Sequence, residues 1–113
     1  MSVEIGCVST FKNPKADKEQ AMKIIEEAAE VFGAWQTYNE NEESFESGYC
    51  ASALLHECAD VIQATCNFLA GLGVTDFTGY MASCKINNRY RGREYEDTKL
   101  TFTKEIKEQM VLC

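Results

Sequence analysis

The sequence lacks the features that would mark a membrane, secreted or zinc-binding protein. No stretch approaches the ~18 consecutive apolar residues of a membrane-spanning helix, and residues 1–15 lack the basic segment and apolar run of a signal peptide. The six cysteines form no C-x-x-C pair, which favours reduced and mostly structural thiols over a zinc site. We therefore expect a soluble cytoplasmic protein with no membrane partner.

Positive charge is also scarce. The chain has 11 lysines and arginines against 18 acidic residues, and its formal net charge is −7. Nucleic-acid polymers are bound largely through cations that neutralise phosphates, so such a partner is disfavoured. A small nucleotide remains possible, because a divalent cation can bridge an acidic protein and an acidic ligand.

The length of 113 residues predicts one domain that spans the whole chain, 1–113. The only proline, Pro14, lies in a polar N-terminal arm over residues 1–15. The helical pattern covers a core over residues 16–93, and residues 94–113 form a C-terminal extension. In that extension we expect a short extended piece and then an amphipathic helix.

Three segments place apolar residues at helical spacing, separated by turn-forming residues. They cover residues 17–38, 49–73 and 78–91. Asp17 is the predicted N-cap of the first helix, and Asp76 or Thr75 can cap the third. The second is apolar on most faces, which predicts a buried central helix. We therefore expect an all-α helical bundle that is completed by forming a homodimer or homotetramer.

Four carboxylates occur as two pairs with three-residue spacing. Glu27 and Glu30 lie on the first helix, and Glu57 and Asp60 lie on the second among apolar residues, on a face that should be buried. Buried carboxylates that crowd one another are costly unless something compensates their charge. Magnesium prefers carboxylate and water oxygens, so the set predicts a Mg²⁺ site, with Mn²⁺ as a possible substitute. The alternative for the first pair is a solvated acidic face.

A different metal centre is improbable. Di-iron carboxylate bundles need an E-x-x-H pair on two helices. The only histidine, His56, is adjacent to Glu57 and cannot fill that role.

Cations and amides gather at the end of the third helix. The residues suited to phosphate oxygens there are Lys85, Asn88, Arg89 and Arg91. The alternative is a set of solvated cations favoured by the helix dipole. Two more residues suit the sugar and base of a nucleotide. Asn67 lies on the same side of the second helix as Asp60, and its amide suits a sugar or base edge. Trp35 suits stacking, although its place in the apolar arc favours a core role.

The order of these motifs resembles the MazG-like, all-alpha nucleoside triphosphate pyrophosphohydrolases. EE-x-x-E ends at Glu30, E-x-x-D ends at Asp60, and K-x-x-N-R-x-R starts at Lys85. The resemblance implies hydrolysis of a nucleoside triphosphate, with a deoxynucleotide expected, to the monophosphate and pyrophosphate. It assigns the four carboxylates to magnesium and catalysis, and the K-x-x-N-R-x-R residues to the triphosphate.

Two alternatives stay open. One is a non-catalytic helical module that uses the same fold and its acidic surface to bind a protein. The other is a sibling enzyme that acts on dUTP or on a phosphoribosyl nucleotide.

Overall fold

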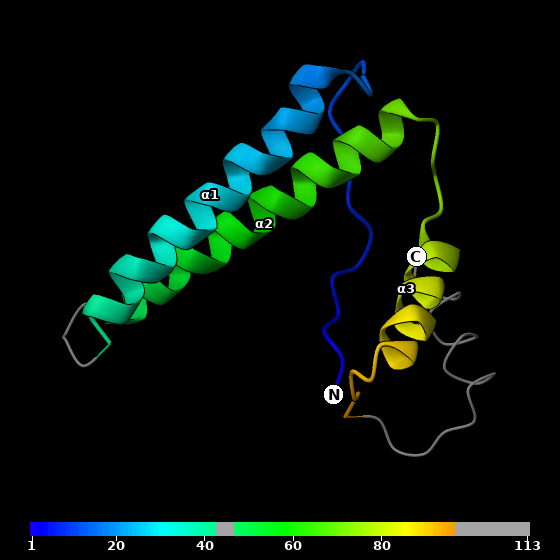
Figure 1. The fold of residues 1–113 in the computed structure, drawn as a ribbon. Coiled ribbons are helices and arrows are strands. Elements are labelled where there is room, and N and C mark those ends of the chain that lie inside the picture. Colours follow the sequence, from blue (N-terminus) through cyan, green and yellow to red (C-terminus); the bar gives the residue numbers. More distant parts are fainter. Residues whose placement is uncertain (43–46, 97–113) are drawn as a thin grey trace. The chain divides into compact units, whose positions relative to one another are not determined.

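The computed structural model describes residues 1–42 and 47–96 (Figure 1). Within these ranges it has three α-helices and no strand, which confirms the all-α prediction. They are α1 (Lys18–Glu40), α2 (Ser47–Gly71) and α3 (Thr78–Tyr90). The helix expected in the C-terminal extension lies outside the described residues. Within the part of the chain that is described, no helix is both long and apolar enough to cross a membrane.

The chain divides into two units. Among the described residues, one unit comprises 9–42 and 47–74, and the other comprises 1–8 and 75–96. The first unit contains α1 and α2, which pack side by side and run in opposite directions (Figure 1). The second contains α3. The predicted arm is divided between them, since residues 9–15 belong with the α1–α2 hairpin.

Helix α1 begins where the sequence predicts. Asp17 has an extended backbone, and its Oδ1 accepts a hydrogen bond from the Gln20 backbone N–H at 2.9 Å. This bond satisfies one of the donors that a helix N-terminus leaves unpaired. The N-cap prediction for Asp17 is therefore confirmed.

Helix α3 begins at Thr78, two residues after Asp76, one of the two residues predicted to cap it. Asp76 Oδ1 accepts from the Thr78 backbone N–H at 3.0 Å and from the Thr78 hydroxyl at 2.7 Å. These bonds to Thr78 lower the pKa of Asp76. The prediction of Asp76 or Thr75 as the N-cap is therefore wrong, because Phe77 occupies that position and makes no side-chain cap bond, although Asp76 still accepts from the first residue of α3.

Helix α2 ends where the arm crosses it. A Cβ added at Gly71 would lie 2.3 Å from the Lys15 carbonyl carbon and 2.4 Å from the Ala16 nitrogen. Both are backbone atoms, so only glycine allows this approach. Gly73 then takes a φ of +82°, the left-handed conformation that commonly follows a helix.

The prediction that α2 is buried is wrong for a single chain. Its buried residues are Cys50, Ala64 and Asn67, whereas Leu55 is 68% exposed. The physical reason is that α1 and the arm cover only part of the α2 surface, so one face of this apolar helix stays open.

We predict opposite effects for two glycine-to-alanine substitutions. Gly71→Ala should lower the free energy of unfolding by about 1–3 kcal/mol, because its methyl group meets arm backbone. Gly33→Ala should raise it by about 0.5–1 kcal/mol, because a Cβ there meets nothing within 4 Å and alanine favours a helix interior. Urea unfolding measures both, and equal stabilisation by the two would contradict the arm contact.

Candidate metal centre

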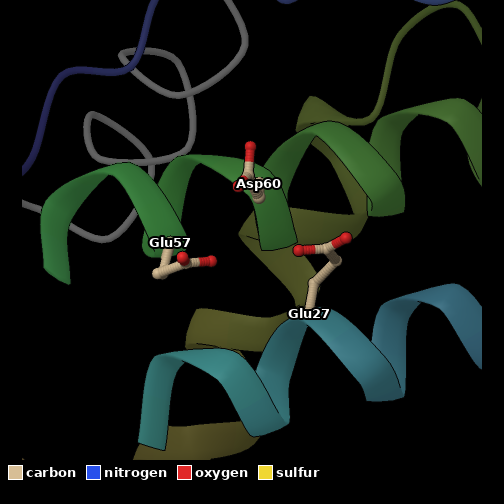
Figure 2. Close-up of side chains that lie close together, drawn as sticks. All are labelled: Glu27, Glu57 and Asp60. Atoms are coloured by element: carbon tan, nitrogen blue, oxygen red, sulfur yellow. The ribbon is translucent and has the colours of Figure 1, made fainter. Parts of the chain in front are cut away.

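Three of the four predicted acids converge between α1 and α2. Glu27, Glu57 and Asp60 each offer a carboxylate oxygen, and these atoms lie within 4.8 Å of one another. Figure 2 shows Glu27 reaching from α1 toward α2, which carries the other two. The three-residue spacing places Glu57 and Asp60 on one side of α2, and packing of the helix pair brings Glu27 to them. We call these three residues the acidic cluster.

The members of the acidic cluster differ in burial. Glu27 is only 8% exposed. Glu57 is half-buried, and its Oε2 atom is buried without a hydrogen-bond partner in the described part of the chain. Asp60 is exposed, so the prediction of a buried face is wrong for this residue.

One lysine offsets part of this charge. Lys23 Nζ lies 3.2 Å from a Glu27 oxygen and 3.5 Å from a Glu26 oxygen. The hydrogen bond with Glu27 is the main cause of a raised pKa for Lys23. A single cation, itself half exposed, leaves the acidic cluster with an excess of negative charge.

Glu30 lies outside the converging set but responds to it. The negative charge of Glu27 raises the pKa of Glu30, and the neighbouring side chain of Glu57 raises it further. Glu30 is therefore linked electrostatically to two members of the acidic cluster, Glu27 and Glu57, and lies at the margin of the cluster.

The acidic cluster fits a hard divalent cation. All its donors are carboxylate oxygens, which suit magnesium, manganese or calcium rather than softer metals. The orphaned Glu57 Oε2 supplies an independent sign, because a buried acceptor without a donor is unfavourable until a cation or a proton reaches it.

The predicted phosphate-binding residues lie in the second unit, where three of them surround Tyr95. Lys85 Nζ lies 5.0 Å and the Arg89 guanidinium 5.5 Å from the centre of the Tyr95 ring. Asn88 Nδ2 donates to the Tyr95 hydroxyl at 3.2 Å. Arg91 is the exposed C-cap residue of α3. Sequence reasoning missed Tyr95 because it assigned this residue to the extension.

The two residues proposed for the rest of a ligand have different surroundings. Trp35 is 45% exposed and stacks on Phe32, with ring centres 5.9 Å apart. The core interpretation of Trp35 is therefore wrong. Asn67 is 5% exposed and lines a cavity formed with the arm.

Comparison with known proteins adds no family assignment. No protein-family model, curated protein or solved structure matches the chain. The resemblance to the MazG-like enzymes thus stays a prediction carried by the motifs.

We predict that Glu30→Gln stabilises the protein in metal-free buffer at neutral pH. Because the folded-state pKa of Glu30 is raised, the folded protein binds more protons than the unfolded chain between the ordinary glutamate pKa and the raised value. Stability therefore falls as pH rises through that interval, and the penalty is fully present above it. Glutamine removes the penalty, so the melting temperature should rise.

The gain from Glu30→Gln should vanish when the pH falls below the ordinary glutamate pKa, since the wild-type side chain is then protonated in both states. Glu40→Gln at the end of α1 is the matched control. A gain for Glu30→Gln that is the same at all pH values would show that charge crowding is not its cause.

Proposed function

We propose that the chain is a magnesium-dependent nucleoside triphosphate pyrophosphohydrolase of the MazG-like type. The observation that carries the proposal is the convergence of Glu27, Glu57 and Asp60, with Glu57 Oε2 left without a donor. Together with the motif order, this arrangement supports a cation site that meets a phosphorylated substrate.

The carboxylates would hold the cation, and one of them would accept the proton of the attacking water. When bound, a divalent cation neutralises charge on phosphate oxygens and makes a coordinated water more acidic. Glu27, Glu57 and Asp60 would hold it. Glu27 is already paired with Lys23, whereas Glu30 is exposed at the margin of the cluster. Glu30 is therefore the better candidate to accept the proton of the attacking water.

The proposed reaction has one bond exchange. The water oxygen bonds to the α-phosphorus, its proton goes to a carboxylate, and the bond from the α-phosphorus to its bridging oxygen breaks. Pyrophosphate then leaves with the bonding electrons. The resemblance assigns the binding of this tail, and the stabilisation of its charge, to the cations and amide of the K-x-x-N-R-x-R motif. They are Lys85, Asn88, Arg89 and Arg91.

We predict magnesium-dependent release of pyrophosphate from one or more common NTPs or dNTPs. The double variant Glu57→Gln, Asp60→Asn should lose at least about a hundredfold in rate, because it removes two of the three converging carboxylates. An assay of pyrophosphate across the full panel measures this. Glu40→Gln, which neutralises an exposed acid at the end of α1, should keep the wild-type rate.

The same panel separates the alternatives. Release confined to dUTP or to a phosphoribosyl nucleotide would favour the sibling enzyme. No release from any nucleotide, together with a melting temperature that magnesium does not raise, would favour the non-catalytic module.

A homo-oligomer is proposed on separate grounds. Helix α1 carries exposed apolar side chains at helical spacing, including Ile25 at 68% and Phe32 at 59%. With Leu55 on α2, these leave the hairpin with apolar surface that a second copy of the chain would cover.

We predict a solution mass of two or four chains by light scattering. Phe32→Lys should shift the mass toward one chain, because a charge is costly in an apolar interface. Thr37→Lys adds the same charge at another exposed position of α1 and should leave the mass unchanged. A wild-type mass of one chain in dilute buffer would overturn the proposal.

A further inference from the structure

The hairpin unit contains a cavity that the sequence motifs do not predict. It measures about 350 Å³ and lies among the arm, the first turns of α1 and one residue of α2. This volume falls at the lower end of the range for small-molecule sites, about 300–1,000 Å³. The lining that matters here is Phe11 and Pro14 from the arm, Gln20 and Lys23 from α1, and Asn67 from α2.

Asn67 brings a directed donor to this cavity. Its Oδ1 accepts from the Phe11 backbone N–H at 3.1 Å and from Gln63 Nε2 at 3.0 Å. Since a backbone N–H can only donate, these bonds fix which amide atom is the oxygen. The Nδ2 group donates no hydrogen bond within the described residues and is not among their buried unpartnered atoms, so it is accessible although Asn67 as a whole is 5% exposed. Asn67 lines the cavity and keeps an unused, accessible amide donor, which an acceptor on a ligand in the cavity can satisfy.

The walls of the cavity indicate what kind of ligand this is. Phe11 is 66% exposed beside Asn67, so its ring is free to stack on a flat group. The hairpin unit has four basic residues, all lysines, and three of them line the cavity: Lys12, Lys15 and Lys23. These lysines are exposed, whereas Asn67, the residue with the unused donor, is buried and carries a neutral amide. A neutral base therefore suits the buried part, and negative charge suits the rim.

The cavity and the acidic cluster share helices α1 and α2, so the distance between them can be estimated. Lys23 lines the cavity and pairs with Glu27 of the cluster. Asn67 follows Asp60 by seven residues on α2, and Gln20 precedes Glu27 by seven on α1. At a rise of about 1.5 Å per residue, the two sites lie about 10 Å apart along the hairpin. A nucleotide is long enough to bridge such a gap between its base and its phosphates.

We propose that this cavity holds the base and sugar of the nucleotide, with Asn67 Nδ2 donating to an acceptor on the base edge and Phe11 stacking on the ring. This inference rests on the proposed function and extends it, because it makes arm residues 11–15 part of the substrate site. The phosphates then pass Lys23 on the way to the acidic cluster.

Asn67→Asp tests the donor directly. Aspartate keeps the oxygen that accepts from Phe11 but replaces the donor with an acceptor, so it repels the same base edge. We expect at least about a tenfold rise in KM and an altered ranking of bases, while the magnesium requirement stays unchanged. Asn39→Asp, the same chemical change at an exposed position of α1, should match wild type.

Phe11→Ala is the second variant, and its exposed ring makes misfolding improbable. Loss of stacking should weaken nucleotide binding about tenfold without a change in which base is preferred. If both variants retain wild-type KM and base ranking, the pocket is elsewhere and this inference fails while the reaction stands.

A readout that is independent of turnover separates the two proposals. Magnesium-free ¹⁵N-labelled protein would be titrated with each deoxynucleoside monophosphate and, separately, with inorganic triphosphate. The Asn67 side-chain amide and the Phe11 backbone amide should shift with a monophosphate. If they do so in a protein that releases no pyrophosphate, the reaction proposal fails and the pocket stands. A response to inorganic triphosphate alone would mean a phosphate site and overturn the assignment.

Discussion

The crowding of like charge between α1 and α2 is the constraint on which the rest of the hairpin depends. Three carboxylate oxygens lie within 4.8 Å of one another, and Lys23 is the one basic side chain paired with them in the described part of the chain. Each acid is tolerable alone at a helix surface. Together and partly buried they oppose the packing that brings α1 onto α2, so a compensating cation would act on folding and on chemistry at once.

The arm provides the complementary constraint at the other end of the hairpin. Backbone contact at Gly71, together with the Gln63 bond to the Ser9 carbonyl at 2.9 Å, holds it across α2. The Gln20 side chain also donates to the Ala64 carbonyl at 3.1 Å, joining α1 to α2 beside the cavity. Uncharged hydrogen bonds thus fix the end of the hairpin, and charges occupy its middle. A cation bound at the acidic cluster would therefore change the charge balance in the middle of the hairpin and leave the hydrogen bonds at its end in place.

Helix positions and the N-cap of α1 could be predicted from the sequence because they depend on local chemistry. Asp17, the two glycines at the end of α2 and the acidic spacing all act within one or two turns of the chain. Burial could not be predicted in the same way. Asp60 and Trp35 sit in apolar stretches, yet both are exposed, because exposure depends on which neighbour covers a given face rather than on composition.

The arm shows most clearly where sequence reasoning stops. A polar segment that contains the only proline reads as a connection, and nothing in its composition predicts that Phe11 will meet Asn67 across 56 positions of the chain. Two α2 residues contact the arm, but each has an ordinary local explanation in the sequence. Gly71 reads as a helix terminator, and Asn67 reads as a polar residue. Only their shared contact with the arm reveals a cavity. A carboxylate motif can therefore mark a candidate site from the sequence alone, whereas the cavity beside it is lined largely by a segment that carries no motif.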